Sequence, residues 1–233
     1  MQAGHKLCRQ LVEVVQVPAP RWSPADRAFM ARALELARSG LGQTQPNPSV
    51  GCVLVRDDQV VGEGRTQAGG RPHGEAMALA MAASSAVGSH AYVTLEPCAH
   101  ESARGPSCSV SLIDSGVTAV TISVLDPDPR TQGIGMARLK AAGLAVRLGL
   151  LADKGRVQIA GFEKRLRTGL PWIHVGTDDG TFDVVLRAGV SADFSAYLAE
   201  LGTQGVMRVC CVGGSPAAHK ASALKLVDSV DPV

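Results

Sequence analysis

Four residues of this chain have the types and the spacing of a metal site that activates water. His73 and Glu75 are separated by one glycine, and two cysteines, Cys98 and Cys108, follow further along the chain. One imidazole and two thiolates give Zn²⁺ three protein ligands and leave the fourth tetrahedral position open for water. Zinc-bound water loses a proton near neutral pH, and hydroxide of this kind removes exocyclic amino groups from rings.

The four residues have distinct predicted roles. His73, Cys98 and Cys108 would bind zinc, whereas Glu75 would take a proton from water and hand it to the departing nitrogen. Taken singly, each residue has a plainer interpretation: a helix-capping histidine, a solvated acid in the first turn of a helix, and two small core thiols. The complete set favours a zinc-dependent hydrolase, and hence an enzyme.

Composition restricts the other classes of function. Hydrophobic residues make up 45% of the 233 residues and charged ones 19%, which is typical of a soluble globular protein. The formal net charge of +2, without a run of five basic residues, argues against nucleic acid as a partner. No apolar run approaches the roughly 18 residues that span a bilayer, and residues 1–22 lack a signal-peptide pattern. We therefore expect a cytoplasmic protein with reduced cysteines and no membrane partner.

The chain before residue 150 alternates between helical and strand patterns. Ser23-Pro24 can cap a helix over 24–39, and two apolar runs separated by polar residues predict a hairpin of 50–55 and 60–64. The following elements are expected in order: a helix starting at the His73 motif, a strand at 92–95, a helix at 110–115, a strand at 117–124, a helix at 135–142 and a strand at 145–148. This order predicts a layered α/β domain with a mixed, mainly parallel sheet.

The rest of the chain repeats the pattern on a smaller scale. An amphipathic helix is expected over 153–167, strands near 172–175, 182–186 and 206–212, and helices near 194–201 and 217–224. Residues 1–22 are a loosely attached extension with a strand pattern at 11–17. We thus divide the chain into an extension (1–22), a main domain (23–150) and a small α/β region (151–233).

Several further motifs strengthen the enzyme interpretation. They are MARALELA at 30–37, PNPSVGCVLV at 46–55, GEG at 62–64, YVTLEPCAH at 92–100 and DPDP at 126–129. Together with the four residues above, they resemble the pyrimidine deaminase domain of the RibD family of riboflavin biosynthesis proteins, within the cytidine deaminase-like superfamily. The resemblance covers residues 25 to 150 approximately.

The resemblance implies a three-layer α-β-α fold, zinc at His73, Cys98 and Cys108, and Glu75 as the proton shuttle. It also implies substrate contacts by Asn47, by His100 and by Arg104, the last near a ribosyl or ribityl phosphate. Asn47 between two prolines is also a good turn residue, and a basic loop residue such as Arg104 is often only solvated. The implied reaction is hydrolytic deamination of a phosphorylated ribosylaminopyrimidine, with release of ammonia.

The chain departs from the family at three places. Gly74 replaces the usual alanine between His73 and Glu75, and the loop between the two cysteines is one residue longer and differently ordered. In the tail, GLPW at 169–172, LGTQGV at 201–206 and VGGSP at 212–216 resemble parts of the family's NADPH-dependent reductase domain, but Val212 replaces an acidic residue and the intervening segment is short. We expect a reductase remnant that does not use NADPH and serves in packing or in a homodimer or homo-oligomer.

Two other functions stay open at this point. The changed loop and the shortened tail allow a deaminase of another aminopyrimidine or related heterocycle in a specialised pathway. They also allow a non-catalytic dimerising partner of a separate reductase, although all four positions of the zinc motif are filled.

Overall fold

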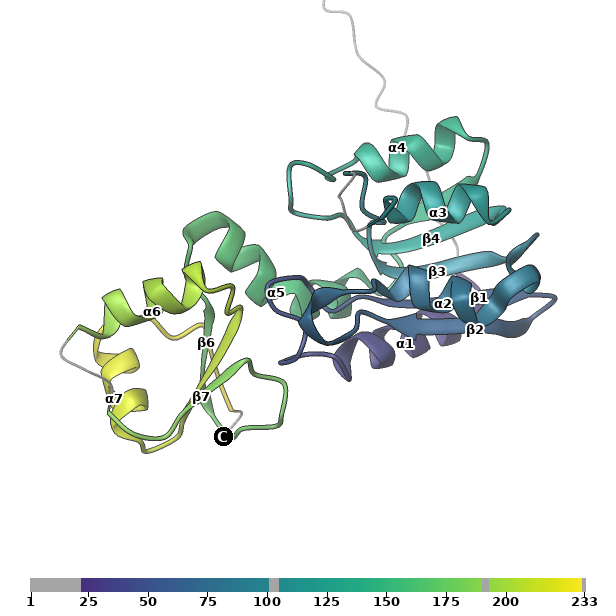
Figure 1. Cartoon of the computed structure of the whole chain (residues 1–233). Coiled ribbons are helices and arrows are strands. Elements are labelled where there is room, and N and C mark those ends of the chain that lie inside the picture. Colours follow the sequence, from purple (N-terminus) through teal and green to yellow (C-terminus); the bar gives the residue numbers. More distant parts are fainter. Residues whose placement is uncertain (1–21, 101–104, 190–192, 232–233) are drawn as a thin grey trace, which may run out of the picture.

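The computed structural model describes residues 22–100, 105–189 and 193–231, which form two α/β lobes joined by a long helix, α5 (Ala152–Thr168) (Figure 1). The strand pattern at 11–17 and the candidate substrate residue Arg104 lie outside the described residues. None of the helices in the described part of the chain is both long and apolar enough to cross a membrane.

The first lobe is built on a five-stranded sheet with the order β2-β1-β3-β4-β5. Its strands are β1 (Gly51–Arg56), β2 (Gln59–Arg65), β3 (His90–Leu95), β4 (Ala119–Val124) and β5 (Ala145–Leu148). Strand β1 runs antiparallel to β2 and β3, whereas β3, β4 and β5 are mutually parallel. The predicted hairpin closes through Asp57 and Asp58, both with positive φ, as a two-residue hairpin turn requires.

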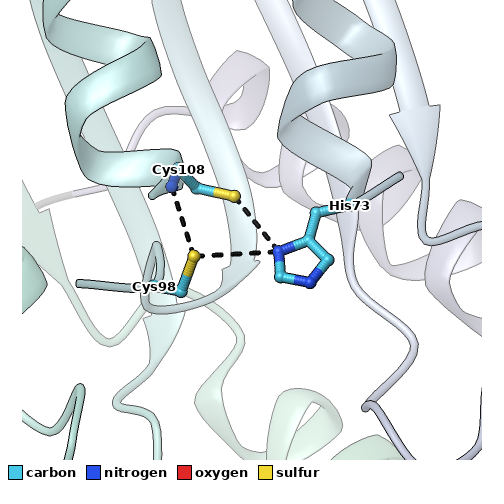
Figure 2. Close-up of side chains that lie close together, drawn as sticks. All are labelled: His73, Cys98 and Cys108. Carbon is cyan, nitrogen blue, oxygen red and sulfur yellow. Dashed lines mark hydrogen bonds between the residues drawn. The ribbon is translucent and has the colours of Figure 1, made fainter. Parts of the chain in front are cut away.

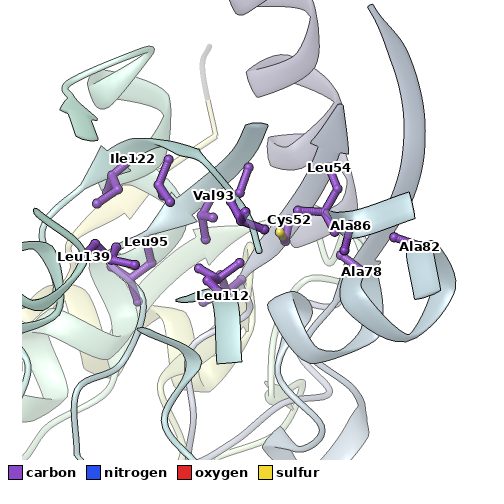
Figure 3. Packing of buried hydrophobic residues seen from close by; sticks show 14 of the residues in the cluster. Cys52, Leu54, Ala78, Ala82, Ala86, Val93, Leu95, Leu112, Ile122 and Leu139 are labelled. Atoms are coloured by element: carbon purple, nitrogen blue, oxygen red, sulfur yellow. The ribbon is translucent and has the colours of Figure 1, made fainter. Parts of the chain in front are cut away.

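Helices cover both faces of this sheet. They are α1 (Pro24–Arg38), α2 (Gly74–Ala82), α3 (Cys108–Asp114) and α4 (Ile134–Ala141), with short 3₁₀ turns η1 (Ala68–Gly70) and η2 (Ala83–Ala86). Side chains alternate along β1. Cys52 and Leu54 join the core beneath α2 and α3 (Figure 3), whereas Val53 joins a second cluster beneath α1. The predicted three-layer α-β-α fold with a mixed, mainly parallel sheet is confirmed.

A buried carboxylate anchors α1 to the sheet. Ser23 and Asp26 form a reciprocal capping box at the start of the helix. Asp26 also accepts a hydrogen bond from the Tyr92 hydroxyl at 2.7 Å and one from Arg147 at 3.3 Å. Burial opposes the charge, but these donors lower the pKa of Asp26 to about 2. One side chain therefore links α1, β3 and β5.

The second lobe has its own sheet and core. Its elements are β6 (Trp172–Gly176), β7 (Val184–Leu186), α6 (Phe194–Thr203), β8 (Arg208–Val212), α7 (Pro216–Ala223) and β9 (Ser229–Val230). The strands are all parallel in the order β7-β8-β6-β9, and Phe194 and Leu198 of α6 pack with Val209 of β8. Strand β9 was not predicted, because two residues carry no readable periodicity.

Other boundaries shift by a few residues. Helix α3 begins at Cys108 rather than at 110, and β7 begins at Val184 rather than at 182. Phe182 instead stacks on His174 of β6, which explains an apolar residue just ahead of the strand. The five cysteines in the described part of the chain are free thiols, as the sequence predicted.

We expect Asp26→Asn to lower the free energy of unfolding by roughly 1–3 kcal/mol at pH 7, because three charge-assisted hydrogen bonds weaken together. A depressed pKa stabilises the fold above the unfolded pKa, so this contribution is present above about pH 4 and is lost as the pH falls through about 2. Urea unfolding of both proteins at pH 7, 5 and 3 should show the gap closing on acidification. Asp153→Asn, at a side chain that is 98% exposed, is the matched control; equal loss in both variants would contradict the anchoring role.

Candidate active site

The three candidate metal ligands converge from distant parts of the chain. His73 is the N-cap of α2, Cys98 follows β3, and Cys108 is the first residue of α3. Their ligand atoms all lie within 4.8 Å of one another. His73 Nδ1 is 3.3 Å from the Cys108 sulfur and 3.7 Å from the Cys98 sulfur (Figure 2). A tetrahedral zinc with bonds of 2.0–2.3 Å holds its ligand atoms about 3.5 Å apart, so this donor set fits the ion.

Gly74 allows the first ligand to reach this position. A Cβ built on Gly74 would lie 2.5 Å from the carbonyl oxygen of Val50, closer than side chains tolerate. The N-terminus of α2 therefore presses directly against the chain entering β1. In this backbone the replacement of the family's alanine by Gly74 relieves a contact and leaves His73 and Glu75 in place.

The two cysteines differ in their readiness to ionise. Hydrogen bonds from the Cys108 side chain and backbone amide lower the pKa of the Cys98 thiol to about 4. The hydrogen bond with Cys98, together with burial, raises the pKa of the Cys108 thiol. Burial opposes protonation of His73, but Cys98 and Glu75 raise the pKa of its imidazole. A cation at the centre of the three groups would stabilise both thiolates, the form in which cysteine binds metals.

Glu75 is buried beside the metal ligands. Only 3% of the Glu75 surface is exposed to solvent. Its Oε2 has no hydrogen-bond partner among the described residues. Burial raises the pKa of this carboxyl. A buried carboxylate oxygen without a partner is costly, and such groups usually serve a catalytic purpose or bind a ligand.

Glu75 and two of the three candidate ligands line a cavity of about 460 Å³. The predicted residues Asn47, His73, Glu75, Cys98 and His100 all line it, whereas Cys108 faces a second, smaller hollow of about 300 Å³. The other lining residues are Pro46, Pro48, Val50, Thr66, Arg71, Leu95, Glu96, Asp126, Asp128, Arg130, Phe162, Arg165 and Leu166. The last three belong to α5, so the helix that joins the lobes also forms one wall of the cavity.

The two described candidates for substrate contact are both held in place. Asn47 Nδ2 donates to the carbonyl of Gly70 at 2.9 Å, and a Cβ on Gly70 would lie 2.6 Å from that nitrogen. The positive φ of Gly70 also requires glycine. His100 lies 3.4 Å from the Thr131 hydroxyl. The turn role and the cavity position of Asn47 are therefore compatible, and its contact with substrate stays a prediction.

Sequence reasoning missed several acids of this cavity. Glu96 accepts hydrogen bonds from the backbone amides of Gly133 and Met136, each at 2.9 Å, and so caps the start of α4. Asp128 holds Arg130 through hydrogen bonds of 2.5–3.0 Å, and burial raises the pKa of Asp126 to about 7. The DPDP and EPC motifs were the available signal for these residues, but they gave no role.

Comparisons with known proteins agree with this geometry. A family model described as the cytidine and deoxycytidylate deaminase zinc-binding region matches residues 23–124. The chain is 49% identical to riboflavin biosynthesis protein RibD of Escherichia coli over 64% of its own length and 41% of that protein. It is 45% identical to a diaminohydroxyphosphoribosylamino-pyrimidine deaminase of Buchnera aphidicola, over 63% of this chain and 99% of that protein.

A solved structure of Acinetobacter baumannii RibD is also similar. It superposes with a TM-score of 0.75 at 26% identity, covering 90% of this chain and 87% of that one. The chain spans less than half the length of the E. coli relative. The zinc-binding region, the near-complete coverage of the Buchnera protein and the shared fold all lead to one assignment: the chain belongs to the RibD-type pyrimidine deaminase family of the cytidine deaminase-like superfamily.

Proposed function

We propose that this protein is a zinc-dependent hydrolytic deaminase of a phosphorylated ribosylaminopyrimidine, of the diaminohydroxyphosphoribosylaminopyrimidine type. The observation that carries the proposal is the position of the buried Glu75 carboxylate in one cavity with His73 and Cys98, whose ligand atoms converge with that of Cys108. The name of the Buchnera relative, which aligns over 99% of its length, supports the choice of substrate.

In the proposed mechanism, His73, Cys98 and Cys108 would hold Zn²⁺, which would lower the pKa of bound water and so supply a nucleophile at neutral pH. Glu75 Oε2, which has no partner among the described residues, accepts the proton that water loses. The same carboxyl then delivers a proton to the exocyclic nitrogen, and ammonia leaves as the ring carbon gains its oxygen. The burial of Glu75 shields this transfer from bulk solvent.

Asn47, His100 and Arg104 are the proposed substrate contacts. Asn47 and His100 lie on the cavity wall, where an amide and an imidazole can pair with the polar edge of a pyrimidine. Arg104 is proposed on the family resemblance alone. We also propose that the second lobe is a reductase remnant without NADPH: its sheet has four strands, one of them only two residues long.

Replacing Cys108 with serine should remove most of the bound zinc, because a hydroxyl does not supply the thiolate charge that the ion requires. We expect close to one zinc per wild-type chain by elemental analysis and well under half in Cys108→Ser. Cys210→Ser is the control, since Cys210 Sγ lies in the second lobe and donates to the Gly176 carbonyl at 3.8 Å, where a serine can also donate. Full zinc occupancy in Cys108→Ser would rule out Cys108 as a ligand.

Glu75→Gln should reduce ammonia release by roughly 10²–10⁴-fold, because the amide cannot carry the proton. Zinc content should be unchanged, since Glu75 lies outside the ligand set. Glu35→Gln, at an exposed position of α1, controls for the loss of one negative charge. Comparable turnover in Glu75→Gln and wild type would refute the shuttle role.

The substrate and the fate of NADPH can be tested together. The zinc-loaded protein is given the diaminopyrimidine nucleotide with and without NADPH, and both ammonia and nucleotide absorbance are followed. We expect ammonia release at the same rate in both samples and no NADPH oxidation. Ammonia release from a different aminopyrimidine alone would redirect the substrate assignment, and oxidation of NADPH would refute the remnant proposal.

A further inference from the structure

The wall that α5 contributes to the cavity carries a basic residue with unused hydrogen-bonding capacity. We propose that Arg165 of α5, together with Arg71, binds the phosphate of the substrate, so that the linker helix is part of the substrate site. This inference rests on the proposed function, because it assigns residues to the anionic part of that substrate.

The Arg165 side chain is held at the cavity wall, but not all of its N–H donors have acceptors in the described structure. One of its terminal nitrogens donates to the carbonyl oxygen of Pro46 at 3.1 Å, which places the guanidinium beside the turn that carries Asn47. Its Nε is buried and has no partner among the described residues. A guanidinium offers five N–H donors in a planar fork, and the second terminal nitrogen of Arg165 has no partner among the described residues.

Arg71 has even fewer partners. It precedes the His73 motif by one proline, lines the same cavity, and forms no hydrogen bond or ion pair with any described residue. Its Nε is buried as well. Arg71 also lines the smaller hollow beside His73 and Cys108, which places it near the candidate metal ligands.

The third arginine of the cavity, Arg130, differs because it has an ion-pair partner. Arg130 is bound by both carboxylate oxygens of Asp128, at 2.5–3.0 Å, so its charge is neutralised within the protein. Asp183 is the acid whose charge acts on Arg165, but its Oδ2 accepts the backbone amides of Met207 and Arg208 and no ion pair with Arg165 forms. Arg71 and Arg165 are therefore the two cavity arginines that form no ion pair within the described structure.

Guanidinium groups that line a cavity without an ion-pair partner can bind an anionic ligand there. A phosphate monoester supplies a double negative charge and three strong acceptor oxygens, and arginine binds such groups through paired hydrogen bonds. The cavity volume of about 460 Å³ is within the range of small-molecule sites. A phosphorylated sugar on the pyrimidine matches both the charge and the unused donors.

The contacts of α5 with both lobes explain how the second lobe contributes to the cavity. Gln158 donates to the Leu34 carbonyl of the first lobe at 2.7 Å, whereas Lys164 forms an ion pair with Asp228 of the second. A Cβ on Gly161 would lie 2.6 Å from the Met207 carbonyl, so α5 also packs closely on the chain that enters β8. The second lobe thus fixes the helix that presents Arg165.

The test compares the phosphorylated substrate with its dephosphorylated nucleoside. We expect Arg165→Gln and Arg71→Gln each to raise KM for the phosphorylated substrate by about 10-fold to 100-fold, the effect of losing a charge-assisted hydrogen bond. For the nucleoside, kcat/KM should stay within about two-fold of wild type, and Arg165→Lys should recover part of the loss. Arg167→Gln, two residues along α5 at a largely exposed side chain that pairs with Glu163, is the control and should behave as wild type.

Binding of ribose 5-phosphate to the zinc-loaded protein, followed by calorimetry, gives a readout independent of turnover. Binding to wild type and Arg167→Gln with loss in Arg165→Gln supports the phosphate site, even if the protein fails to deaminate the proposed substrate. Equal losses on the phosphorylated and dephosphorylated substrates would show a merely structural role and overturn the proposal. So would unchanged ribose 5-phosphate binding in both Arg165→Gln and Arg71→Gln.

Discussion

The structure depends on holding one nitrogen and two sulfurs, from three separate segments, within 4.8 Å of one another. These segments meet beyond the carboxyl end of β3, the edge at which open α/β sheets usually place their ligands. Close backbone packing makes the convergence possible. A Cβ on Gly135 would lie 2.1 Å from the carbonyl of Pro97, next to Cys98, just as one on Gly74 would meet Val50. Gly74 thus brings the start of α2, which carries His73, against the chain entering β1, and Gly135 brings α4 against the segment that carries Cys98.

The same edge concentrates charge that the fold must compensate. Glu96 is 2% exposed and is satisfied by backbone amides at the start of α4, so its burial has a structural explanation. Glu75 is equally buried but has an oxygen without a partner in the described structure. The two buried acids of this cavity therefore differ in their partners. Glu96 accepts hydrogen bonds from backbone amides, whereas Glu75 lies beside the candidate metal ligands. This difference is the physical basis for assigning proton transfer to Glu75 and not to Glu96.

Sequence alone predicted most of the first lobe and the residues that converge at the candidate metal site, for local reasons. Ser23 and Asp26 make a capping box that can be recognised from their spacing, and the apolar runs of β1 and β3 alternate between two cores as strands do. The histidine and cysteines are recognisable because metal chemistry restricts residue types. The contributions of Arg71, Asp126 and Arg165 were not foreseen, because each depends on which donors and acceptors the tertiary structure leaves unpaired. No periodicity in α5 distinguishes Arg165 from Arg167.

The linker helix also changes how the shortened second lobe is understood. Here α5 is packed between the lobes, with Gln158 bound to the first and Lys164 to the second. Without the second lobe, the C-terminal half of α5 would lose its ion pair with Asp228 and its packing on Met207. Helix ends without tertiary support fray, and Arg165 lies in that half. The second lobe is then best explained as the support that keeps the cavity wall, and the arginine on it, in position.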